Sequence, residues 1–142
     1  MRRLLPVLLV ALSAAGCTGA AASSAASASV TAPTSAVTTE TFSGTVDVGA
    51  NVYHPFTVAL SGGQVNVILT AAGPPSTIYM GLGVGTYDGT ACTPLTGGSV
   101  VAQAAATAQL SGFLNAGSYC VAVYDAGNQT AAIAYAVTVT HY

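Results

Sequence analysis

From about residue 40 to the end of the chain, apolar residues alternate with small or polar residues, which is the period-two pattern of half-buried β-strands. Turns rich in Gly, Pro, Asn and Asp separate these runs. The strand-like runs are residues 42–48, 56–60, 65–69, 78–84, 110–114, 119–124 and 133–139. About eight short strands with no helical pattern predict an all-β fold, an antiparallel β-sandwich of jelly-roll type.

Two stretches of this pattern stand apart from the rest. Gly81, Gly83 and Gly85 alternate with the apolar residues of the run at 78–84. A row of glycines on one face of a strand indicates close approach by another backbone or by a ligand. Residues 100–108 are rich in Ala, and their pattern does not decide between strand, helix and loop.

The first 16 residues have the organisation of an export signal. Two arginines at positions 2 and 3 precede an apolar stretch, 4–15, that is too short to cross a bilayer. The stretch ends in Ala14-Ala15-Gly16-Cys17, which resembles the lipobox of bacterial lipoproteins. In that family the signal is cut before the Cys, which carries acyl chains such as palmitate. The resemblance therefore implies a signal peptide at 1–16 and a lipid anchor on Cys17.

The alternative is an ordinary secretory signal cut within residues 19–21, which would discard Cys17 but would still export the protein. Thr18 stands where retention in the inner membrane usually requires Asp, so the lipoprotein resemblance implies the outer membrane if the cell has two membranes. Residues 17–39 consist mainly of Ala, Ser and Thr, which leaves no large side chain to bury. We expect a flexible tether there, followed by a β-sandwich domain at 40–142.

Charge excludes several classes of partner. The 142 residues include six charged ones, and both cations lie at positions 2 and 3. Without the signal the chain keeps four carboxylates and no Lys or Arg, which is a side-chain charge of −4. Such a domain cannot neutralise phosphates, so nucleic-acid binding is excluded. The same composition predicts a domain without salt bridges.

Cys92 and Cys120 lie outside the signal. Because export places them in an oxidising compartment, we expect a disulfide that closes a long loop. The alternative is a catalytic or metal-binding thiol.

Several short segments resemble the bacterial pre-peptidase C-terminal domain family over residues 40–142. They are SGTV at 43–46, YHPFTV at 53–58, LSG at 110–112, AGSYCVAVYD at 116–125 and YAVTVT at 135–140. Members of that family are β-sandwich accessory modules of secreted proteins, and some of them bind calcium, collagen or polysaccharide. The resemblance implies a fold and a binding role, although this chain carries no catalytic domain beside the module.

Seven tyrosines and no Trp are the aromatic residues that could stack on sugars. Tyr79 and Tyr87 flank the glycine row, and we expect them to form an exposed pair that binds carbohydrate. The alternative is that these tyrosines are half-buried strand residues whose hydroxyl groups reach water.

Asp47, Asp88 and Asp125 are candidates for calcium ligands, together with loop carbonyls. Their alternative role is to stabilise turns through hydrogen bonds to the backbone. His54 and His141 are the only histidines, and we expect both to be exposed polar residues rather than zinc ligands. No Gly-x-Ser-x-Gly elbow is present, and four scattered acids do not suggest a glycosidase pair.

The sequence thus predicts a non-enzymatic envelope lipoprotein without a cofactor, which displays a β-sandwich for adhesion, structure or partner binding. The alternative is a carbohydrate- or calcium-binding accessory module that serves a separate secreted enzyme. In either case the expected partners are a membrane, through the lipid anchor, and an envelope protein or polysaccharide.

Overall fold

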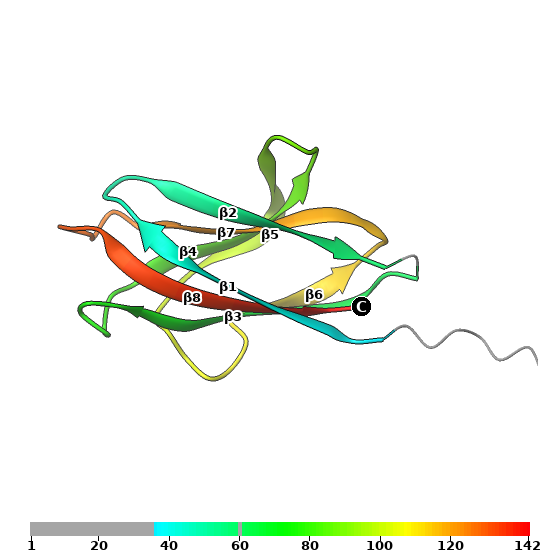
Figure 1. The fold of residues 1–142 in the computed structure, drawn as a ribbon, viewed down its shortest axis with the longest axis horizontal. Helices are drawn as coiled ribbons and strands as arrows, with labels where there is room; N and C mark the ends of the chain where they lie inside the picture. The colour runs from blue at the N-terminus through cyan, green and yellow to red at the C-terminus, as the bar shows by residue number, and fades with distance from the viewer. Residues whose placement is uncertain (1–35, 60) are drawn as a thin grey trace, which may run out of the picture. The chain divides into compact units, whose positions relative to one another are not determined.

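The computed structural model describes residues 36–59 and 61–142. The predicted signal peptide at 1–16, the lipidated Cys17 and the tether up to residue 35 lie outside the described residues. Eight β-strands follow one another along the described chain (Figure 1). They are β1 (Thr38–Val46), β2 (Asn51–Val58), β3 (Gly63–Gly73), β4 (Met80–Tyr87), β5 (Cys92–Ala102), β6 (Leu110–Leu114), β7 (Gly117–Asp125) and β8 (Ile133–His141). Within these residues there is no helix long and apolar enough to cross a membrane.

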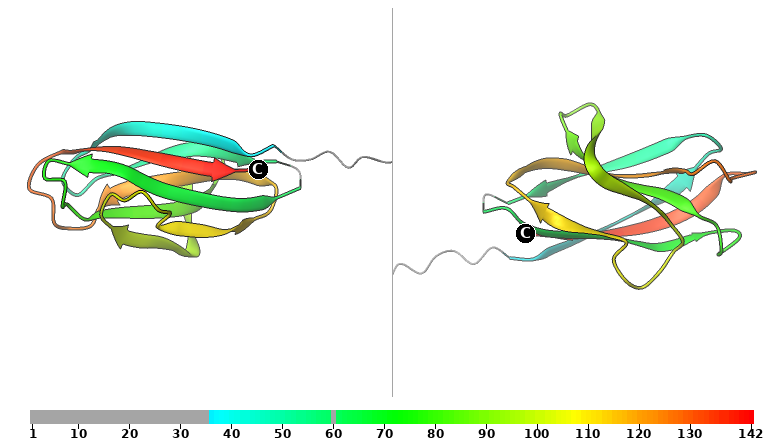
Figure 2. Two further views of the ribbon diagram at one scale, coloured as in Figure 1. Left: turned by 90° about the horizontal axis from the view of Figure 1, so that it is seen from below. Right: turned by 180° about the vertical axis from the view of Figure 1, so that it is seen from behind.

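The strands form two antiparallel four-stranded sheets, with the orders β1-β8-β3-β6 and β2-β7-β4-β5. This pairing is the jelly-roll arrangement, so the predicted fold is confirmed. The side with β1 and β2 faces the viewer in Figure 1, and the side with β5 and β6 faces the viewer in the right-hand view of Figure 2.

The core lies between the two sheets and takes alternate residues from the paired strands, as the period-two pattern predicts. Burial of these aliphatic side chains is the main favourable contribution to folding in a domain of this kind. The largest fully buried side chains are Val46, Val58, Val67, Leu69, Met80, Leu82, Val121, Val123, Val137 and Val139.

Several strand bounds differ from the predicted runs; β2, for example, begins at Asn51 instead of residue 56. β1 begins at Thr38, two residues before the expected start of the domain, so the predicted tether ends earlier. Thr39 and Thr41 pair with threonines of β8, because β-branched residues favour strands. The ambiguous stretch at 100–108 is the end of β5 and the loop that follows it. The register of β5 against β4 shifts between Gly83 and Gly85, and Gly97 lies in the resulting bulge with φ +73°. Because the bulge interrupts the alternation of apolar and polar residues, the sequence pattern did not predict this strand.

The predicted disulfide is present between Cys92, at the start of β5, and Cys120 in β7, with a Cα–Cα distance of 5.8 Å. The two residues are 28 positions apart in the sequence. A closed loop of this length contributes about 3.5 kcal/mol in the chain-entropy account. The bond therefore ties the edge strand of the β2-β7-β4-β5 sheet to its interior.

Neither histidine is the exposed polar residue that we expected. His54 of β2 stacks on Phe42 of β1 at 4.7 Å between ring centroids, and its Nε2 lies 2.7 Å from the Tyr135 hydroxyl of β8. His141 is 4% exposed, and its Nε2 lies 2.8 Å from Oε1 of Glu40. Glu40 therefore has a side-chain partner on β8, in a contact that is an ion pair only when His141 is protonated. Both histidines are enclosed because β1 and β2 close the same side of the sandwich.

Burial lowers the pKa of His54 and raises the pKa of Tyr135. Both shifts favour the neutral forms, and the two neutral groups share one hydrogen bond whose direction depends on the His54 tautomer. This hydrogen bond joins the two sheets.

We predict that the stability of the domain falls as the pH drops below about 6.5, the ordinary pKa of His. The pKa of His54 is lower in the folded chain than in the unfolded chain, so between these two values the unfolded chain binds more protons. The contribution of His54 to stability is therefore complete above the pKa that His54 has in the unfolded chain. It is lost as the pH falls toward the lower pKa that His54 has in the folded chain. The measurement is the melting temperature at pH 7.5 and at pH 5, for the wild type and for His54→Gln. Between pH 7.5 and pH 5 the melting temperature of the wild type should fall by more than that of His54→Gln. Equal falls in melting temperature would show that His54 is not the source of the pH dependence.

Candidate functional site: a groove over the glycine row of β4

The outer face of the β2-β7-β4-β5 sheet carries the predicted glycine row, and each glycine has a different neighbour. A Cβ on Gly81 would overlap the ring of Tyr124 from β7. A Cβ on Gly85 would overlap the backbone carbonyl of Thr93 from β5. The close approach that the sequence indicated is therefore real, and it involves an aromatic ring at one end of the row and backbone at the other.

Gly83, in the middle of the row, lies on the floor of a groove of about 430 Å³. A Cβ there would lie 3.3 Å from Ser99 Oγ and 3.8 Å from the Cβ of Ala122. Strand pairing aligns Tyr53, Ala122, Gly83 and Ser99 in one row across the sheet. The two small residues in the middle of this row make the depression, and Tyr53 and Ser99 stand on either side of it.

A second row supplies the end wall of the groove. Asn51, Tyr124 and Gly81 are aligned in it, next to the Tyr53 row. The side chains of Asn51, Ser99 and Tyr124 make no hydrogen bond to any other described residue. Their amide and hydroxyl groups are therefore available to a ligand, and each of them can both donate and accept.

The β4–β5 hairpin forms the other end of the groove and projects from the body of the sandwich (Figure 1). Its turn is held by Asp88, whose Oδ1 accepts hydrogen bonds from the backbone N–H groups of Ala91 and Thr90, both at 2.8 Å. These bonds lower the pKa of the exposed Asp88 carboxyl. The Tyr53 hydroxyl donates to the Thr90 carbonyl at 2.7 Å, so this wall of the groove is also fixed to the hairpin.

The predicted carbohydrate-binding pair is not brought together. Tyr79 and Tyr87 lie at opposite ends of β4, about 26 Å apart at the usual rise per residue of a strand. Tyr79 is 50% exposed, whereas Tyr87 is half-buried and packs near Tyr53, with 6.1 Å between ring centroids. The tyrosines that wall the groove are Tyr53 and Tyr124. The sequence did not indicate Tyr53 and Tyr124, because the pattern along a sequence does not give the order and register of strands in a sheet.

The three calcium candidates do not meet at one site. Asp125 accepts from the Gly49 N–H at 2.8 Å and from the Gly127 N–H at 2.7 Å, and these bonds lower its pKa. Asp47 belongs to the same turn as Gly49. Asp47 and Asp125 therefore lie at the same end of the sandwich. Asp88 lies at the other end, because Asp125 pairs with the first residue of β4 and Asp88 follows its last. Asp88 and Asp125 have the turn-stabilising role given as the alternative. In the described part of the chain no three His, Cys, Asp or Glu side chains are grouped to hold a metal ion.

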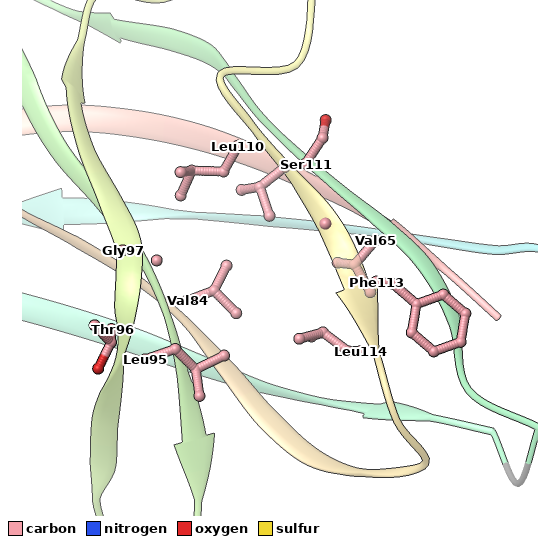
Figure 3. Close-up of a pocket in the computed structure, with 12 residues that line it drawn as sticks. Val65, Val84, Leu95, Thr96, Gly97, Leu110, Ser111, Phe113 and Leu114 are labelled. Carbon is pink, nitrogen blue, oxygen red and sulfur yellow. The ribbon is translucent and has the colours of Figure 1, made fainter.

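A second cavity, of about 510 Å³, opens between the two sheets where β5 and β6 form the side of the sandwich. Figure 3 shows Val65, Val84, Leu95, Leu110 and Leu114 directed into it, whereas the ring of Phe113 points away. This cleft is an opening of the aliphatic core. Thr96 and Ser111 also line it, but the Ser111 hydroxyl already donates to Asn66. The groove over Gly83 has three polar side chains without a partner among the described residues, which can fix the orientation of a bound molecule.

Comparisons with known proteins do not identify a family. No protein-family model matches the chain, and no curated protein matches it. Among solved structures, the chain is similar to PliG of Aeromonas hydrophila, a periplasmic lysozyme inhibitor of g-type lysozyme, with 18% sequence identity and a TM-score of 0.46. The similarity covers 72% of this chain and 84% of that one.

We predict that Gly81→Ala destabilises the domain by about 1–3 kcal/mol, because its methyl group would displace the Tyr124 ring. The matched variant Gly83→Ala should cost less than about 1 kcal/mol, because its methyl group faces the groove. Urea unfolding of the two variants and the wild type measures both values. Equal losses of unfolding free energy would show that the glycines serve a shared backbone requirement instead.

Proposed function

We propose that this protein is an exported, non-enzymatic binding module, anchored to the cell envelope through a lipid on Cys17, with the groove over Gly83 as its binding site. The observation that carries the proposal is the groove itself. It is a shaped depression with unpaired polar side chains, built on a sheet whose edge is fixed by a disulfide.

The disulfide supports export. Cys92 and Cys120 are bonded within a single domain, and structural disulfides persist in oxidising compartments. Together with the apolar signal at 1–16 and the Gly16-Cys17 junction, this favours a protein that acts outside the cytoplasm.

The surroundings of the two histidines support a non-enzymatic role. Acyl-transfer chemistry needs a histidine within hydrogen-bond reach of a nucleophile and open to substrate. His54 is bonded to Tyr135 between the sheets, and His141 is bonded to Glu40. Neither residue lines the groove. The groove therefore offers binding groups without a carboxylate or a histidine.

An accessory module for a separate secreted enzyme would use the same binding face and would differ only in its partner. Adhesion and partner binding need a module that is held at the cell surface, and the lipid on Cys17 would supply this.

The anchor is tested by the Cys17→Ala variant. We predict that the wild type sediments with the membranes and incorporates labelled palmitate, whereas Cys17→Ala is released in soluble form and carries no label. Thr18→Ala is the matched control, since it changes the neighbouring residue and keeps the acylated thiol. Recovery of the wild type and Cys17→Ala in the same soluble fraction would refute the anchor.

A further inference from the structure

The geometry of the groove points to a ligand class, and we propose that it binds an uncharged carbohydrate. This inference rests on the proposed function, because it assigns a ligand to the same binding site. Three properties carry it: the aromatic walls, the unpaired polar groups and the absence of cations.

The walls offer apolar surface of the kind that packs on the faces of sugar rings. Tyr53 is 38% exposed, and its hydroxyl is bonded to the Thr90 carbonyl, which holds the ring in place beside the floor. The ring of Tyr124 lies against the sheet because Gly81 has no side chain beneath it. A ring held in this way loses little conformational entropy when a ligand packs on it.

The polar groups around the floor match hydroxyl groups. The Asn51 amide, the Ser99 hydroxyl and the Tyr124 hydroxyl can each donate and accept, and each lacks a partner among the described residues. A sugar hydroxyl has the same dual character. A ligand that satisfies these groups at the rim while its apolar face covers Gly83 and Ala122 uses the whole site.

Charge decides between neutral and anionic carbohydrates. The chain has no Lys or Arg after position 3, so no cation of this kind is available to pair with a carboxylate, sulfate or phosphate on the ligand. The acids nearest in sequence to groove residues are Asp125, next to Tyr124, and Asp88, near Ala91, and both already accept hydrogen bonds from backbone N–H groups. The site therefore favours a ligand without charge.

The position of the groove disfavours an extended peptide. β4 is paired on both sides, with β7 and with β5, so its backbone groups cannot receive an added strand. A purely aliphatic ligand would fit the cleft between β5 and β6 better than this groove, because that cleft is lined by Leu and Val side chains. A carbohydrate is the ligand that uses both the aromatic and the polar groups present.

The test is retention of the full chain, purified in a polyoxyethylene detergent that contains no sugar, on immobilised starch, mannan, galactan and polygalacturonate. We expect retention on at least one of the three neutral polymers. Gly83→Val fills the floor, and Asn51→Ala removes a rim group without adding bulk. Each should weaken binding by about tenfold or more. Phe113→Ala is the control, because it removes an exposed aromatic ring from the other sheet. Melting curves establish that each variant is folded.

No retention on any neutral polymer would overturn the proposal, as would retention on polygalacturonate alone or retention that neither groove variant changes. These outcomes are separable from failure of the anchored module. A wild type that stays with the membranes but binds no polymer refutes the carbohydrate alone. A soluble wild type that binds a neutral polymer through the groove refutes the anchor alone.

Discussion

The absence of side chains at three alternate positions of β4 shapes the outer face of its sheet. At Gly81 it allows the Tyr124 ring to lie against the backbone, and at Gly85 it allows the Thr93 carbonyl of the bulged β5 to do the same. Between them Gly83 is left as the floor of a groove. A larger side chain at Gly81 would displace the Tyr124 ring of β7, and one at Gly85 would displace the Thr93 backbone of β5. The walls and the floor of the groove therefore depend on the same steric constraint.

The rest of the domain keeps this face rigid without help from Lys or Arg. The disulfide holds β5 to β7, the Asp88 turn and the Tyr53–Thr90 bond hold the hairpin, and Asp125 organises the turns at the other end. Between the sheets, His54 and Tyr135 supply a hydrogen bond on the side where β1 and β2 meet. These bonds surround a groove whose lining is uncharged and partly aromatic.

The fold was predictable because side-chain alternation is local: each run of apolar residues reports its own strand, and export makes the Cys92–Cys120 bond the expected state. Strand β5 was not predicted, because its bulge and its Gly97 interrupt the alternation of apolar and polar residues. The site was predictable only in part. The glycine row indicated a close approach, but the neighbours across the sheet depend on strand order and register, which place Tyr53 and Tyr124 beside the groove. Tyr79 and Tyr87 are apart for a local reason, since they lie at opposite ends of one strand. Burial of His54 and His141 likewise follows from which strands close the sandwich, and no single segment encodes it.

Binding in the groove over Gly83 is best examined by following backbone amide shifts in an NMR titration of the full chain with a soluble neutral oligosaccharide. We expect the largest shifts on Gly83, Ala122, Ser99 and Asn51, which surround the groove on four different strands. Shifts confined to Leu95, Leu110 and Leu114 would instead assign binding to the cleft between β5 and β6, and the groove would not be the binding site.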